Sequence, residues 1–236
     1  MMTLSIFTII TFFRYRRLTR FGSESTDAYL QRVTHLHLQG KRIQKLENMD
    51  SCTNVKVLYL YDNQIDKIEN LDFAANLQYL QLQNNQISEV PPLSMPCLTK
   101  LYLDDNRISF CSGLDKCTKL EELHMANQSL PEHVSLQFDV GSLMAISRTL
   151  ITLEISGTGI EILAPFTVLR SLRRLFCSNN RVDSIDEIKD MVALRSVSHS
   201  LLTVYRRFCS IVQLSTVISK YCPLCIIMLS SAVIGV

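Results

Sequence analysis

The 236-residue sequence lacks the features that mark most enzymes. It has only seven glycines, which is too few for most nucleotide-binding loops, and it contains no G-x-S-x-G, phosphate-loop or H-E-x-x-H motif. Cys222 and Cys225 have the spacing of a redox motif, but a zinc site needs four ligands and only Cys209 lies near them. We therefore expect a non-catalytic protein with no cofactor and no metal site.

Charge is also scarce, since the formal net charge is only +2. This balance gives no electrostatic signature of a nucleic-acid-binding protein. The distribution is uneven, because all 22 acidic residues lie between Glu24 and Asp190, together with 16 of the 24 basic ones. The chain therefore has an acidic-leaning centre, with a charge of 16 − 22 = −6, between two basic, apolar ends.

Apolar residues recur at a fixed spacing through the centre of the chain. The unit L-x-x-L-x-L-x-x-N-x-I repeats after 22 residues: Val55, Leu58, Leu60, Asn63, Ile65 and Ile68 recur as Leu77, Leu80, Leu82, Asn85, Ile87 and Val90. Such a unit cannot bury its own leucines, and stacking on its neighbours removes them from water at roughly 1.5–3 kcal/mol per side chain. The pattern is that of the leucine-rich repeat.

The period predicts an α/β solenoid of about seven 22-residue repeats. A short, curved parallel β-sheet should line its concave face, and 3-10 or helical segments its convex side. The insertion 131–149 lengthens the fifth unit, and Asp139 followed by Leu143 and Ile146 predicts an N-capped amphipathic helix inside it. An eighth unit starts at Leu194 and Val197 and then loses the pattern.

Two further positions of the repeat carry similar residues in successive units, which predicts structural roles for those residues. A ladder of asparagines, in which each side-chain amide bonds backbone groups of the adjacent coil, is expected at Asn63, Asn85, Asn106 and Asn180. Cys52, Ala74 and Cys117 share a position before the strands, which indicates a small buried site in a reducing compartment.

The two ends of the chain lack the repeat pattern and differ from it in composition. Residues 1–28 form an apolar and basic leader, residues 29–194 the repeat domain, and residues 195–236 an atypical apolar segment. The leader places its arginines after its apolar run, unlike a secretory signal, and both apolar runs are shorter than the roughly eighteen residues that a membrane helix needs. We expect no membrane insertion, with a membrane-tethered repeat protein as one alternative.

The alternation along each strand predicts which side chains face outward on the concave surface. Tyrosine is enriched at binding hot spots, although strands also favour it for its β-propensity. We predict partner binding by ten residues of this face: His37, Tyr59, Tyr61, Tyr79, Tyr102, Asp104, Glu122, His124, Glu154 and Phe176.

Two stretches carry a more specific resemblance. The segment V-L-Y-L-Y-D-N at Val57–Asn63, and E-L-H-M-A-N-Q-S-L-P at Glu122–Pro131 followed by the insertion, resemble the leucine-rich-repeat regulators of protein phosphatase 1. The short repeats are also similar to those of axonemal dynein light chain. The resemblance covers about Tyr29 to Leu194, and both ends of the chain depart from the family's pattern.

This resemblance implies a cytoplasmic, non-catalytic regulatory or targeting subunit that binds the phosphatase catalytic subunit through its concave face. It also implies association with the cytoskeleton or the centrosome. An alternative is a microtubule-, centrosome- or cilia-associated scaffold that contacts tubulin- or dynein-type proteins and does not act on phosphatase.

Overall fold

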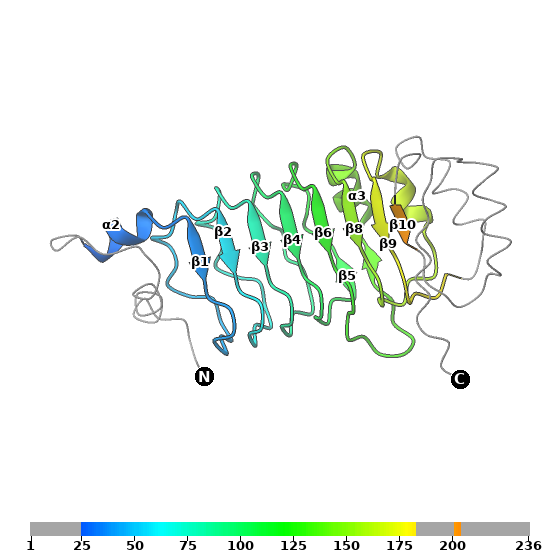
Figure 1. The fold of residues 1–236 in the computed structure, drawn as a ribbon, viewed down its shortest axis with the longest axis horizontal. Helices are drawn as coiled ribbons and strands as arrows, with labels where there is room; N and C mark the ends of the chain where they lie inside the picture. The colour runs from blue at the N-terminus through cyan, green and yellow to red at the C-terminus, as the bar shows by residue number, and fades with distance from the viewer. Residues whose placement is uncertain (1–24, 183–200, 204–236) are drawn as a thin grey trace.

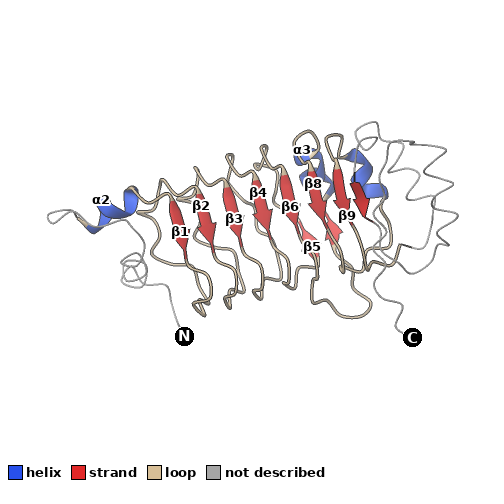
Figure 2. Ribbon diagram, in the orientation of Figure 1, coloured by secondary structure: helices blue, strands red, loops and turns tan. Residues whose placement is uncertain are grey.

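The computed structural model describes residues 25–182 and 201–203 as a solenoid whose strands lie side by side along its long axis (Figure 1). Eight parallel strands form one sheet in the order β1-β2-β3-β4-β6-β8-β9-β10 (Figure 2). The predicted solenoid is confirmed. The strands are β1 (His35–His37), β2 (Val57–Tyr59), β3 (Tyr79–Gln81), β4 (Lys100–Tyr102), β6 (Glu122–His124), β8 (Thr152–Glu154), β9 (Arg174–Phe176) and β10 (Leu201–Thr203).

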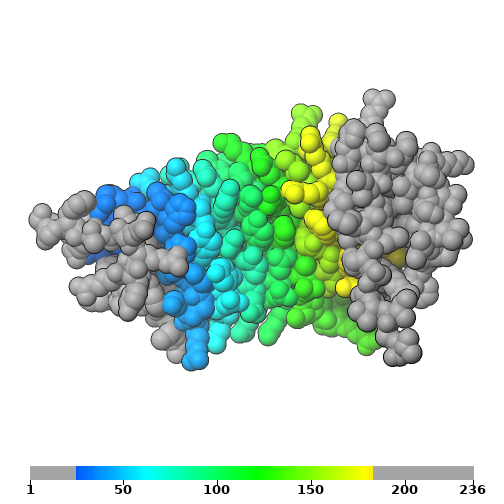
Figure 3. All heavy atoms as spheres, viewed as in Figure 1, coloured from blue at the N-terminus to red at the C-terminus, as the bar shows by residue number. Residues whose placement is uncertain are grey.

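The central residue of each strand fixes the register between coils. Leu58 lies opposite Leu36 on one side and Leu80 on the other, and both flanking residues of each strand are aligned in the same way. These leucines are fully buried, so each coil closes the apolar face of the next. Successive coils form adjacent bands across the molecule (Figure 3).

The ladder asparagines lie at the turns after their strands, where Asn63, Asn85 and Asn106 are buried and Asn180 is partly buried. Asn85 accepts a hydrogen bond from the Ile65 amide at 3.0 Å and donates to the carbonyls of Leu60 and Leu82, both at 3.0 Å. Gln128 makes the equivalent bonds in the fifth coil, accepting from the Ile108 amide at 2.9 Å. Each amide thus satisfies buried backbone groups in its own coil and in the preceding one.

The residue before each ladder position has a left-handed backbone conformation, which we did not predict. The φ angles lie between 52° and 66°, a region that glycine, asparagine and aspartate enter most easily. The seven residues are Gly40, Asp62, Asn84, Asp105, Asn127, Gly157 and Asn179. Because these residue types adopt a positive φ most easily, each coil has a glycine, asparagine or aspartate at this turn.

A short helix closes the first coil and lies across the predicted boundary at residue 28. Helix α2 (Thr26–Gln31) begins after Ser25, whose hydroxyl accepts a hydrogen bond from the Ala28 amide. Tyr29 and Leu30 are buried against the first coil. Helix α2 therefore caps the first coil, because these two apolar residues join its core. Residues 1–24 of the predicted leader lie outside the described part.

The insertion 131–149 folds onto the convex side. Helix α3 (Val140–Ile146) begins after Asp139, whose carboxylate accepts from the Ser142 amide at 2.8 Å, so the predicted capped helix is confirmed. A two-stranded parallel sheet of β5 (Phe110–Cys111) and β7 (Gln137–Phe138) was not predicted. The 3-10 helix η1 (Ala164–Val168) packs near α3, and Phe138 contacts Phe166 edge to face with ring centroids 5.2 Å apart.

The eighth strand of the sheet, β10, lies further along the sequence than we predicted. Leu202 pairs with Leu175, so β10 lies within the segment 195–236 that we set apart from the repeats. The backbone of β9 offers an open edge, which a nearby segment can pair with whether or not it keeps the 22-residue spacing. The described residues do not include the predicted start of the eighth unit at Leu194 and Val197, nor the Cys222–Cys225 pair. Among the described helices, none is long and apolar enough to cross a membrane.

Candidate functional site

The ten predicted binding residues are exposed or partly exposed side chains of the concave face. Eight belong to the strands themselves, and Tyr59, Tyr102 and His124 follow the buried leucine of their strand. Tyr79 is the most open of the tyrosines, at 37% exposed. The outward alternation predicted for this face is therefore observed, although Val57, Ala126 and Thr152 in the same columns are buried.

Rings cluster at the end of the face formed by the first two coils. The His37 imidazole stacks on the Tyr59 ring with centroids 4.5 Å apart and an interplanar angle of 12°. Tyr61 meets the Tyr59 ring edge to face at 6.5 Å. Both geometries are among those that aromatic pairs prefer. Because the rings support one another, this part of the face presents a firm apolar surface.

The middle of the face is an ionic network centred on Glu122. The Tyr102 hydroxyl donates to the Glu122 carboxylate at 2.9 Å, and Lys100 Nζ lies 3.1 Å from the same group. Arg174 adds a third contact at 3.7 Å. Burial acts to raise the pKa of Glu122, but the hydrogen bonds from Tyr102 and Lys100 outweigh it and lower the pKa. Burial, and then the Glu122 hydrogen bond, raise the pKa of Tyr102.

Glu122 remains a predicted partner-binding residue of this face. Two cations of the same chain, Lys100 and Arg174, already contact its carboxylate. Lys100 and Arg174 reach Glu122 from coils on either side, across parallel strands that place the three residues in one row.

Two other carboxylates of the face contact no cation among the described residues. Asp104 accepts a hydrogen bond from the Ala126 amide at 2.8 Å, and Glu154 accepts from the Ser156 amide at 2.9 Å. Burial raises the pKa of Asp104 to about 6 and also raises the pKa of Glu154. Burial lowers the pKa of His124, which lies between these strands and tilts against Tyr102 at 4.6 Å. An incoming cation would meet two partly desolvated carboxylates here.

The prediction omitted two residues that shape the face. Lys100 lies 5.2 Å above the Tyr79 ring as well as beside Glu122, and Arg174 donates to the Thr152 hydroxyl at 2.9 Å. Lys100 and Arg174 occupy the first position of their strands, as do Tyr79, Glu122 and Thr152 in neighbouring strands. This shared position in the repeat is the signal by which the sequence could have identified the two residues. Phe176 also lies on the face, without a ring contact to another described aromatic residue.

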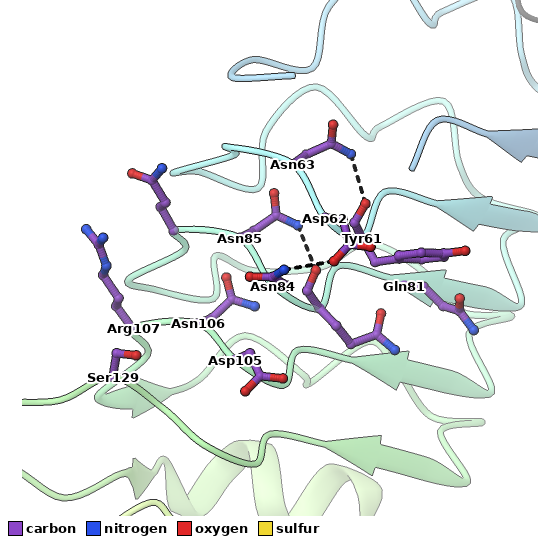
Figure 4. Close-up of a pocket in the computed structure, with 12 residues that line it drawn as sticks. Tyr61, Asp62, Asn63, Gln81, Asn84, Asn85, Asp105, Asn106, Arg107 and Ser129 are labelled. Atoms are coloured by element: carbon purple, nitrogen blue, oxygen red, sulfur yellow. Dashed lines mark hydrogen bonds between the residues drawn. The ribbon is translucent and has the colours of Figure 1, made fainter. Parts of the chain in front are cut away.

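A groove of about 920 Å³ adjoins the concave face where the strands end (Figure 4). Its lining is polar and comes from the second to the fifth coil. The lining residues are Tyr61, Asp62, Asn63, Gln81, Gln83, Asn84, Asn85, Gln86, Asp105, Asn106, Arg107 and Ser129. Tyr61 is shared with the predicted binding residues, so the groove and the face are continuous.

Neither surface assembles a metal site. No group of three or more histidine, cysteine, aspartate or glutamate side chains within the described ranges could hold a metal ion. The described cysteines are free thiols, and burial raises the pKa of Cys52, Cys111, Cys117 and Cys177. The polar and aromatic groups of the face are instead of the kinds that contact other proteins.

Comparison with known proteins supports the repeat directly in one segment and the fold over about four fifths of the chain. A family model described as leucine-rich repeats (2 copies) matches residues 75–115. No curated protein sequence matches the chain. An internalin (InlF) from Listeria monocytogenes has a similar structure, with a TM-score of 0.64 and 24% sequence identity, covering 81% of this chain and 53% of that one.

Two further solved structures from Listeria monocytogenes are similar. An internalin C2 gives a TM-score of 0.55 at 23% identity, covering 76% of this chain and 84% of that one. The functional domain of InlJ gives 0.56 at 18% identity, covering 75% and 45%. The chain thus spans about half the length of the InlF and InlJ structures. At these identities the likeness shows the fold alone: the chain is a leucine-rich-repeat solenoid, an architecture that typically serves as a protein-interaction scaffold.

Proposed function

We propose that this protein is a non-catalytic binding module that holds the catalytic subunit of protein phosphatase 1 on its concave face and regulates or targets it. The observation that carries the proposal is the set of mutually supported rings on a surface with no core to fill: His37, Tyr59 and Tyr61 in one group, and Tyr102 with His124 in another. Large rings held firmly at a surface lose little entropy on binding and bury much apolar area, which is the property of hot-spot residues.

The choice of partner depends on the sequence resemblance. The stretches Val57–Asn63 and Glu122–Pro131, with the insertion after them, resemble protein phosphatase 1 regulatory subunit 42, a testis leucine-rich-repeat protein. The resemblance also leads us to propose a cytoplasmic location at the cytoskeleton or the centrosome.

Electrostatics indicate which part of a partner would contact the face. Asp104 and Glu154 contact no cation among the described residues, and their raised pKa values show that ionisation costs free energy in the free protein. A lysine or arginine of the partner would offset that cost. The favoured arrangement therefore places an apolar contact over the first two coils and a basic contact over the fourth to sixth.

The experiment is a quantitative pull-down with purified phosphatase catalytic subunit. The double variant Tyr102→Ala/Glu154→Arg removes one ring and reverses one charge, and we expect its Kd to rise at least about tenfold. Met144→Ala is the matched control, because Met144 is 62% exposed on helix α3 away from the strands, and its Kd should not change. Thermal unfolding of each variant checks that folding is retained.

Each outcome assigns the function differently. Unchanged binding by the folded double variant would reject the concave face as the site. Failure of the unmodified protein to retain phosphatase, together with co-sedimentation with microtubules, would instead support the cytoskeletal scaffold.

A further inference from the structure

The groove at the ends of the strands holds polar groups of two kinds, those already bonded and those still available. Asn63, Asn85 and Asn106 belong to the ladder, and their amides are fully engaged with backbone groups. Asn84 donates to the Asp62 carboxylate at 2.8 Å. These bonds build a fixed floor and leave no ladder amide free for a ligand.

The available groups belong to the third and fourth coils. Among the described residues, no hydrogen bond reaches the side chains of Gln81, Gln83, Gln86 or Arg107, all of which line the groove. The Gln83 amide oxygen is buried and has no donor. A buried acceptor without a donor costs free energy, so this wall favours a ligand that brings N–H groups.

The composition of the lining narrows the class of ligand. Asp62 and Asp105 would repel the phosphates of a nucleic acid, and the scarcity of apolar side chains disfavours a lipid or a hydrophobic helix. Each glutamine amide offers a carbonyl acceptor and an NH2 donor, so it can pair with both the N–H and the C=O of a peptide group. An extended polypeptide presents these two groups repeatedly along its main chain.

We propose that this groove binds an extended polypeptide segment by its main chain, with Gln83 and Gln86 as the principal contacts and Tyr61 joining the groove to the concave face. Side chains of the bound segment would point away from the amide row, so recognition would depend little on their identity. The proposal deepens the proposed function, because a partner seated on the concave face could extend a flanking segment over this edge.

The test uses a synthetic peptide and no phosphatase, so it can fail or succeed independently of the proposed function. The probe is an uncharged twelve-residue peptide of alanine, threonine and glutamine with blocked ends, compared with the same peptide N-methylated at alternate residues. We expect the plain peptide to shift the side-chain amide resonances of Gln83 and Gln86. N-methylation removes main-chain donors and should weaken binding at least about tenfold.

Variants of the protein sharpen the test. Gln83→Leu/Gln86→Leu keeps side-chain size and removes the amides, and it should lower affinity for the plain peptide by about the same factor. Gln78→Leu is the matched control, because Gln78 is an exposed glutamine of the same coil at the other end of strand β3 and does not line the groove. Equal binding of the N-methylated peptide would overturn the proposal, as would amide shifts produced only by a maltose oligosaccharide.

Discussion

Two amide side chains of the third coil, Asn85 and Gln83, lie two residues apart and have opposite surroundings. Asn85 is buried and bonds four backbone groups, from Ile65, Leu60, Leu82 and Gln83 itself. The side chain of Gln83 makes no hydrogen bond to any described residue, although its oxygen is buried. The ladder amides therefore hold the coils together, whereas the amides and carboxylates that border the concave face keep bonding capacity for a partner.

The largest effect expected from this contrast is on stability. Asn85→Ala would leave several buried backbone groups without partners, and we expect the free energy of unfolding to fall by about 3 kcal/mol. Gln83→Ala should change it by less than about 0.5 kcal/mol, since no bond is lost. Urea unfolding of both variants measures the difference, and similar losses in the two would contradict the division between ladder and face.

A second prediction concerns the half-buried carboxylate of Asp104. Its pKa is raised from 3.8 to about 6 in the folded protein, so the unfolded chain releases this proton at lower pH. Ionised Asp104 therefore destabilises the fold above pH 6, and the penalty disappears as pH falls towards 4.

Asp104→Asn keeps an acceptor for the Ala126 amide and removes the charge. We expect the variant to be more stable than the unmodified protein at pH 8, by at most about 3 kcal/mol, and equally stable near pH 4. Thermal unfolding across this range measures the trend. A difference that is independent of pH would show that Asp104 does not carry the buried charge.

The smallest effect is expected in the ionic network. Glu122→Gln retains a group that can accept from Tyr102 but leaves Lys100 and Arg174 without their counter-charge. Because these groups are partly exposed, we expect a loss of only about 0.5–1 kcal/mol at low salt and almost none at 1 M salt. Urea unfolding at the two salt concentrations separates charge from packing, and a salt-independent loss would assign the effect to packing.

The repeat period accounts for what could be predicted from the sequence. Leu58, Leu80 and the other central leucines were assigned to the core because a 22-residue spacing admits one stacking register. Alternation along the strands then placed Tyr59 and Tyr102 outward. The left-handed turns were also within reach, since glycine, aspartate or asparagine precedes every ladder position.

Contacts between coils could not be predicted from spacing alone. The neutralisation of Glu122 depends on how far the Lys100 and Arg174 side chains extend, which a column of residue types does not specify. The pairing of β5 with β7 and the capping role of Tyr29 and Leu30 likewise depend on where the insertion and the first helix pack. The groove depends on all four coils around it and has no motif of its own.

The row of left-handed turns also constrains how such a protein can be lengthened. A duplicated block of twenty-two residues that carries its own glycine, asparagine or aspartate at the bend would add one more layer without disturbing its neighbours. A β-branched residue at the same bend, as in Asn84→Val, would be strained by roughly 1–2 kcal/mol before any contact with the adjacent layer is considered. The sign of one φ angle per layer therefore decides whether an added layer can fold without backbone strain.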